Sequence, residues 1–91
     1  MPSRKEVTMT LEALMQAEKR TVGVKQTEKA VTKGTALKVY IASDADERVT
    51  GKLVELCQEK NVEIVNVENM TVLGQACKIH VKAAAAAILK P

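Results

Sequence analysis

A lysine repeat is the feature of this sequence best suited to chemistry. Lys25, Lys29 and Lys33 stand four residues apart in the segment GVKQTEKAVTKG, residues 23–34. Helical residues at this spacing lie one above the other on the same face, so the three ammonium groups would form one positive stripe. Because such a stripe repels itself, it is stabilised by an anion.

The start of the same predicted helix has the groups needed to read a nucleic-acid base. Gly23 permits close backbone approach, and Lys25 and Gln26 stand where free N–H groups and the helix dipole favour an anion. Lysine can donate to guanine O6 and N7, and glutamine can both donate and accept. The alternative interpretation is a solvated surface helix whose lysines keep the protein soluble.

Cys77 and His80 stand in C-x-x-H spacing, which could supply two zinc ligands. A structural zinc site needs four ligands, and the only other thiol, Cys57, falls on the inward face of a predicted helix. Nucleophilic catalysis by this pair lacks an orienting third group and an oxyanion hole, and no Walker, dinucleotide-binding or nucleophile-elbow motif is present. We therefore expect no metal, no cofactor, no catalytic residues and a protein that is not an enzyme.

The charges are distributed unevenly along the chain. Residues 19–38 hold six basic side chains and one acid, residues 44–68 hold seven acids and three basic side chains, and residues 69–91 hold three lysines and no acid. A basic pole of this kind suits RNA or DNA phosphate, with solvated surface as the alternative. With Tyr40 as the sole aromatic residue, recognition by stacking of bases on an aromatic sheet is disfavoured.

The first half of the chain predicts two helices and one central strand. Thr10 precedes apolar residues at helical spacing, which indicates a helix running to about Lys19. RTVG is a short extended piece, and a second helix buries Ala30 and Val31 and stops at Gly34. The apolar, β-branched run LKVYIA, residues 37–42, is typical of a strand covered on both faces.

The second half continues the alternation of helices and strands. Asp46 is the expected N-cap of a helix that ends at Asn61, which also explains the acidic run SDADE without a bound cation. VEIVNV, residues 62–67, predicts another strand, and Asn69 can cap a short helix through MTVLGQAC. The pattern as a whole indicates a three-layer α/β/α sandwich. The apolar residues expected on the inward face of the helix after Asp46 are Val49, Leu53, Leu56 and Cys57.

The two ends of the chain differ in their expected structure. Residues 1–6 predict a loose tail and residues 7–91 a single domain. The run from Ala83 to Leu89 is helical by alanine propensity, but a buried last strand fits the pattern equally well. Two unpatterned cysteines and the absence of a secretory or membrane-spanning segment favour a cytoplasmic protein.

Two long segments, GVKQTEKAVTKGTALKVYIASDAD and VENMTVLGQACKIHVKAAAAAI, resemble the L7Ae family of kink-turn RNA-binding ribosomal proteins. The resemblance runs from about Leu11 to Leu89 and is closest to short bacterial members of the YbxF type. It implies a three-layer α/β/α sandwich with a mixed four-stranded sheet, in which residues 83–89 form the last strand. It also implies a non-catalytic protein that recognises kink-turns, with their tandem sheared G·A pairs and extruded nucleotide.

The family resemblance also implies which residues bind RNA. The helix N-terminus of the family enters the widened major groove, and the matching positions are Lys25, Gln26 and Lys29, with Lys33 one turn further on facing phosphate. We add Gly23 to the expected RNA-binding residues because it permits close backbone approach. A second loop holds the extruded nucleotide by apolar contact. By position this loop corresponds to Ile79, His80 and Val81. Apart from the resemblance, we expect the charge of Lys78 to attract phosphate.

The chain departs from the family pattern at both motifs. Archaeal and eukaryotic members have Asn-Glu where this chain has Lys25-Gln26, which removes a carboxylate acceptor and adds a cation. Glycine is usual at Lys78, and an acid often stands at His80. These changes make the second loop more basic and predict a stronger salt dependence of binding.

The expected partners are a kink-turn RNA and the ribosome or a riboswitch, with no membrane, for a protein that we expect to be a monomer. The main alternative is a ribosome-associated structural or protein-interaction module that would use the acidic segment 44–68 as its contact surface. An RNA-modifying enzyme is the third hypothesis, and it lacks a catalytic constellation in the sequence.

Overall fold

Strands and helices alternate along the chain in the computed structural model, which describes residues 13–90. A short helical turn at residues 13–16 precedes the alternation. The tail 1–6 and the helix start at Thr10, both expectations from the sequence, lie outside the described residues. The elements that follow the turn are β1 (Arg20–Val22), α2 (Val24–Lys33), β2 (Ala36–Ala42), α3 (Glu47–Lys60), β3 (Glu63–Val67), α4 (Met70–Ala76) and β4 (Ala85–Leu89).

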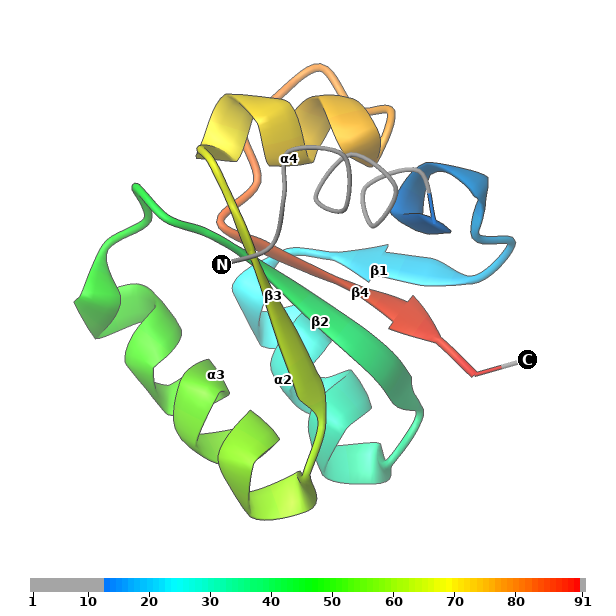
Figure 1. Ribbon diagram of the computed structural model, residues 1–91, viewed down its shortest axis with the longest axis vertical. Helices are drawn as coiled ribbons and strands as arrows, with labels where there is room; N and C mark the ends of the chain where they lie inside the picture. The colour runs from blue at the N-terminus through cyan, green and yellow to red at the C-terminus, as the bar shows by residue number, and fades with distance from the viewer. Residues whose placement is uncertain (1–12, 91) are drawn as a thin grey trace.

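The strands form one mixed sheet in the order β1-β4-β2-β3. β2 and β3 run parallel, whereas β4 is antiparallel to both of its neighbours. α2 and α3 cover one face of this sheet, and α4 and residues 13–16 cover the other (Figure 1). The predicted three-layer α/β/α sandwich with a mixed four-stranded sheet is confirmed.

The alanine-rich segment forms a buried strand, as the family resemblance implies, and not a helix. Ala85, Ala86 and Ala87 are all 0% exposed, because β4 lies between β1 and β2 and is covered on both faces. Their side chains alternate between the two faces: Ala86 belongs to the core under α4, and Ala85 and Ala87 belong to the core under α2 and α3. Pairing of both strand edges satisfies the backbone here and overrides the helix propensity of alanine.

The core under α4 contains the one aromatic side chain of the protein. Tyr40 is fully buried there, together with Leu14, Val67 and Leu73. Burial raises the pKa of Tyr40 to about 12, and the nearby carboxylate of Glu63 adds to the shift, so the phenol stays protonated at neutral pH.

Most helix ends follow the predicted signals. Asp46 accepts a hydrogen bond from a first-turn N–H of α3 at 2.9 Å, and Asn69 does the same for α4 at 2.8 Å. Gly34 and Asn61 end α2 and α3 in the left-handed conformation, with φ of 77° and 58°. These four predictions are confirmed.

The inward face of α3 was only partly predicted by the apolar pattern. Val49 is 49% exposed, so its expected place in the core is wrong. The buried residues of α3 are Thr50, Leu53 and Cys57, and Leu56 is half-buried. Since successive helical residues differ by about 100° around the axis, a buried stripe that starts at Thr50 turns Val49 toward solvent.

The first helix ends earlier than predicted. It stops at residue 16 and not at Lys19. The Nη1 atom of Arg20 donates to the carbonyl oxygens of Met15 at 3.3 Å and Ala17 at 3.2 Å. The guanidinium thus satisfies carbonyl groups that a longer helix would use for its own hydrogen bonds.

Thr27 of α2 is fully buried, and its Oγ1 has no hydrogen-bond partner among the described residues. We expect Thr27→Val to raise the free energy of unfolding by about 1 kcal/mol, because it removes an unsatisfied buried hydroxyl and keeps the side-chain shape. Urea denaturation measures the change, with the exposed Thr32 of the same helix as the matched control in Thr32→Val. A loss of stability in Thr27→Val, relative to Thr32→Val, would contradict the prediction.

Candidate nucleic-acid interface

Three helices begin at one edge of the sheet. β1 and β2 are both antiparallel to β4 and therefore run in the same direction, and β3 is parallel to β2. α2, α3 and α4 follow the carboxyl ends of these strands, so all three N-termini lie at the same end of the sheet. β4 starts at the same edge, directly after the loop of residues 77–84.

A backbone hydrogen bond joins the two segments that the sequence singled out. The N–H of Gly23, the residue before α2, donates to the carbonyl oxygen of Ala85 at 2.8 Å. Ala85 is the first residue of β4, so the start of α2 lies beside the point where the loop 77–84 rejoins the sheet. Gly23 has φ of 103°, a backbone conformation that residues with a side chain rarely adopt. This conformation allows the chain to turn from β1 into α2 within one residue.

The start of α2 is open to a ligand. No side chain caps it and its first turn has no acid, whereas Asp46 and Asn69 cap α3 and α4. Lys25 and Gln26 are exposed on this first turn. Uncapped N–H groups, a cation and an amide together suit a phosphate or the acceptor atoms on a base edge.

The lysine stripe continues along α2, as the spacing predicts. Lys29 and Lys33 are exposed, and Ala30 and Val31 are buried beneath them, so α2 presents one basic and one apolar face. Lys33 is the last residue of the helix, about 14 Å along the axis from its first residue at 1.5 Å per residue. The fold therefore places Lys33 beyond the open N-terminus, at the far end of the stripe.

The loop 77–84 presents an apolar and partly cationic hollow. Val81 is 69% exposed, His80 is exposed and Ile79 is half-buried against the core under α4. These three residues line one hollow of about 370 Å³, as the predicted nucleotide pocket requires. The remaining lining residues are Thr71, Gln75 and Lys82.

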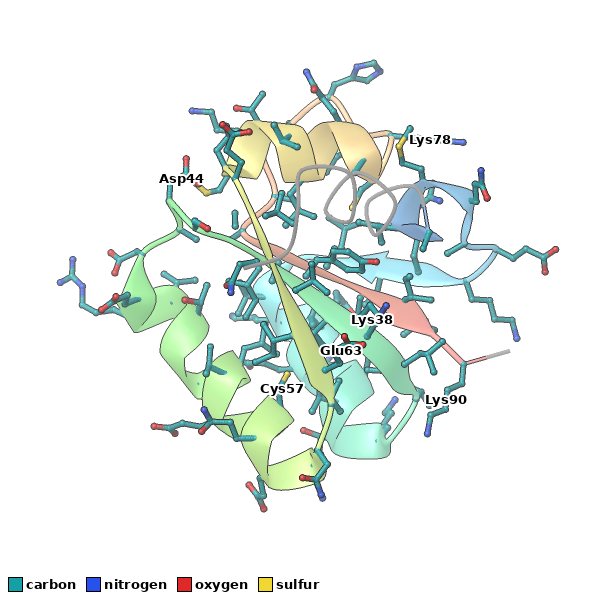
Figure 2. All side chains as sticks on the ribbon, in the orientation of Figure 1. Lys38, Asp44, Cys57, Glu63, Lys78 and Lys90 are labelled. Carbon is teal, nitrogen blue, oxygen red and sulfur yellow. The ribbon has the colours of Figure 1, made fainter. Side chains whose placement is uncertain are left out.

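Lys78 is set apart from this hollow. It has φ of 61°, in the left-handed region that favours glycine, the residue that the family resemblance implies at this position. Figure 2 shows Lys78 beside the carboxyl end of α4, away from the edge where Asp44 lies. The predicted site residues thus separate into the edge with Lys25 and Gln26, the hollow of the loop, and Lys78 at the other end of the loop.

Gly74 of α4 is a residue that the sequence analysis missed. A Cβ at this position would overlap the carbonyl oxygen of Val81, so the loop can approach α4 only because no side chain is present. The loop is also tied to α4 by hydrogen bonds from Ile79 N to Gly74 O and from Ala83 N to Met70 O, both 3.1 Å. A glycine inside a predicted helix is the sequence signal that marks such an approach.

The two thiols are placed for packing. Cys57 belongs to the core under α2 and α3 and Cys77 to the core under α4, so the sheet lies between them. Burial raises the pKa of both thiols, although the nearby Arg20 partly offsets the shift of Cys77. Within residues 13–90, no three His, Cys, Asp or Glu side chains lie close enough together to hold a metal ion.

The acids near the edge serve helix ends. Asp44 Oδ1 accepts from the N–H of Met70, the first residue of α4, at 2.8 Å. The carboxylate of Asp46 accepts from the backbone and side chain of Arg48, which lowers its pKa. The expectation that the start of α3 explains these acids is confirmed for Asp46, whereas Asp44 is bonded to the start of α4.

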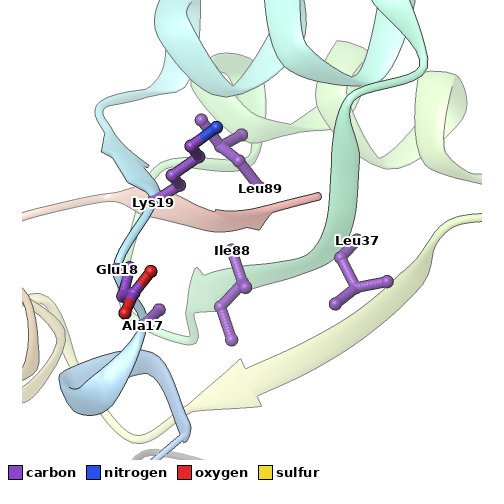
Figure 3. A pocket seen from close by; sticks show the side chains of 6 residues that line it. All are labelled: Ala17, Glu18, Lys19, Leu37, Ile88 and Leu89. Atoms are coloured by element: carbon purple, nitrogen blue, oxygen red, sulfur yellow. The ribbon is translucent and has the colours of Figure 1, made fainter. Parts of the chain in front are cut away.

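Another hollow, of about 450 Å³, lies at the opposite end of β4 (Figure 3). Leu37, Ile88 and Leu89 give it an apolar lining, completed by residues 17–19. It is separated from the Gly23–Ala85 hydrogen bond by the length of the strand, so it is not part of the basic surface.

Within the described part of the chain, none of the helices has the length and apolar character needed to cross a bilayer.

Comparison with known proteins gives the same family as the sequence resemblance. The family model of the ribosomal protein L7Ae/L30e/S12e/Gadd45 family matches residues 5–91. An RNA-binding protein of Geobacillus sp. (strain WCH70) is 46% identical over 82 residues, which cover 90% of this chain and all of that protein. The RNA-binding protein YbxF of Geobacillus stearothermophilus is 44% identical over 82 residues, with the same coverage of both chains.

Solved structures agree with the fold. The 15.5kD RNA-binding protein of Giardia lamblia superposes with a TM-score of 0.83 at 30% identity, over 98% of this chain and 78% of that chain. Since the family is one of ribosomal proteins and the bacterial relatives are named as RNA-binding proteins, the expectation that the chain is not an enzyme is confirmed. Sequence, fold and relatives lead to one assignment: the chain belongs to the ribosomal protein L7Ae/L30e/S12e/Gadd45 family, as a short bacterial-type member.

Proposed function

We propose that this protein binds RNA without catalysis and recognises kink-turns. The observation that carries the proposal is the junction at the sheet edge, where the hydrogen bond between Gly23 and Ala85 fixes the open start of α2 beside the end of the loop 77–84. One surface can then contact the base edges in the kink and the nucleotide that is extruded next to it. The names of the bacterial relatives support RNA as the ligand.

The start of α2 would read the sheared G·A pairs. Lys25 and Lys29 can donate to guanine O6 and N7, and the Gln26 amide can donate to an acceptor and accept from a guanine N–H. Regular A-form RNA hides these edges in a deep and narrow groove, so the helix can reach them only where the duplex is distorted. This requirement makes the kink itself the specificity determinant.

The loop would hold the extruded nucleotide. Ile79 and Val81 offer apolar contact to a base, and the exposed His80 can stack on it or donate to it. Because kinked and extended RNA conformers exchange, a protein that binds only the kinked one shifts the population toward it. Stabilisation of the kink then needs no energy source and no covalent chemistry.

We further propose a bacterial, cytoplasmic setting, in which a monomer binds kink-turns of ribosomal RNA or riboswitches. The bacterial relatives and the ribosomal family support this setting. The protein-interaction alternative would use the acidic segment 44–68 as its contact surface. Two of its seven acids, Asp44 and Asp46, are engaged at helix ends and are less available to a partner.

The first test compares a kink-turn RNA with the same RNA in which Watson–Crick pairs replace the tandem G·A pairs. At fixed salt, we expect the kink-turn to bind at least about 100-fold more tightly, because each bidentate base contact contributes about 1–3 kcal/mol of discrimination. A titration followed by fluorescence anisotropy measures both affinities. Equal, salt-sensitive binding of the two RNAs would reduce the lysine stripe to a non-specific electrostatic patch.

A second test addresses the role of Gly74 in positioning the loop. We expect Gly74→Ala to weaken kink-turn binding roughly tenfold, about 1.4 kcal/mol, because the loop must move away from α4. An RNA with an abasic site at the extruded nucleotide should bind the variant and the unmodified protein equally. Gly51→Ala on α3 is the matched control, since its Cβ meets nothing within 4 Å. If Gly74→Ala weakened binding of both RNAs to the same degree, the loss of affinity would reflect a general folding defect instead.

A third test separates strain from charge at Lys78. We expect Lys78→Gly to raise the free energy of unfolding by about 1 kcal/mol, because glycine adopts φ of 61° without strain. The same change should weaken RNA binding and reduce the salt slope, log affinity against log salt concentration, by about 0.7–0.9, as for one lost phosphate contact. Lys78→Ala should reproduce the loss of binding without the gain in stability. Unchanged binding in both variants would exclude Lys78 from the interface.

A further inference from the structure

The groove between α2 and α3 is a second basic feature of the surface. It has a volume of about 400 Å³. Lys29 and Lys33 line it from α2, and Lys52 lines it from α3 with Leu56 beside it. Neither the sequence pattern nor the family resemblance assigned a role to Lys52. The other lining residues are Glu28 and Thr32.

The topology places these lysines opposite one another. α2 and α3 both follow parallel strands and start at the same edge of the sheet, so the two helices run in the same direction. Lys29 and Lys52 are each the sixth residue of their helix. Both therefore lie about 8 Å along the helix axis from the shared edge at 1.5 Å per residue.

The charges in the groove are not balanced. Three ammonium groups line it against the one carboxylate of Glu28. The ion pairs within residues 13–90 are Lys38–Glu63 and Arg48–Asp46, and neither involves a lysine of the groove. Like charges held on facing helices repel one another, so the arrangement favours an anion between them.

We propose that this α2–α3 groove holds a backbone phosphate of the bound RNA, with Lys52 as a phosphate-binding residue. The inference rests on the proposed function and extends its surface from the start of α2 onto α3. Continuity favours RNA over an acidic protein, because Lys29 belongs both to the base-reading stripe and to the groove. A strand that leaves the kink along this stripe reaches Lys33 and Lys52 next.

The test uses Lys52→Gln and Lys60→Gln in the 91-residue chain. Both remove one positive charge from an exposed position of α3 and keep a good helix former. Lys60 is outside the groove and about 12 Å further along the helix, beyond the screening length of about 8 Å at physiological salt. The affinity for a kink-turn RNA is measured from 50 to 300 mM KCl, together with the thermal unfolding of each variant.

We expect Lys52→Gln to weaken binding several-fold and to reduce the salt slope by about 0.7–0.9, as for one lost phosphate contact. The ratio of affinities for the kink-turn and its Watson–Crick control should stay unchanged, because phosphate contacts carry no sequence information. Lys60→Gln should leave the slope as in the unmodified protein.

Equal slopes for Lys52→Gln and Lys60→Gln, in a protein that still prefers the kink-turn, would overturn the groove proposal and leave an acidic protein segment as the better occupant. Failure of the proposed function gives a different result. In that case the unmodified protein itself shows no preference between the two RNAs.

Discussion

The hydrogen bond from Gly23 to Ala85 constrains the whole basic surface. β1 and β4 pair in register from Arg20 opposite Ile88 to Val22 opposite Ala86, and the Gly23–Ala85 bond continues this ladder by one step. The chain must therefore leave the sheet at Gly23, and α2 begins at the next residue. As a result, the first amide groups of α2 are held at the edge by the rigidity of the sheet and not by a flexible connection.

The same edge separates opposite charges. On the side of α2 it carries exposed Lys25 and an uncapped helix start, and on the side of α3 it carries Asp44 and Asp46. The acids complete the starts of α4 and α3, whereas the start of α2 has no such internal partner. A polyanion approaching this edge is therefore attracted toward α2 and repelled from the start of α3, which orients it before contact.

The fold could be predicted where the signal is local. Asp46, Asn69, Gly34 and Asn61 mark helix ends through their own side chains or backbone preferences, and all four were predicted correctly. The alanine run could not be decided from its own residues. A run of alanines is apolar at every position, so it shows neither the helical nor the strand periodicity. Only pairing with β1 and β2 makes this segment a strand.

The candidate site shows the same limit. Lys25 and Gln26 could be singled out because helix position and residue type are both readable in the sequence. Gly74 carried only the weak signal of a glycine inside a predicted helix, and Lys52 carried none. The importance of both depends on neighbours across the fold, the Val81 carbonyl and the lysines of α2. The exposure of Val49 likewise depends on which side of α3 meets the sheet.

The fully buried alanines of β4 have a consequence for how this protein can vary. At Ala85, Ala86 and Ala87 any larger side chain would overpack a core that is closed on both faces, so these positions tolerate little substitution. The exposed positions at the start of α2 and in the loop 77–84 have no such restriction. Mutational freedom is therefore concentrated where ligand contacts would be made, and a lineage can change its preferred ligand while its scaffold stays nearly constant.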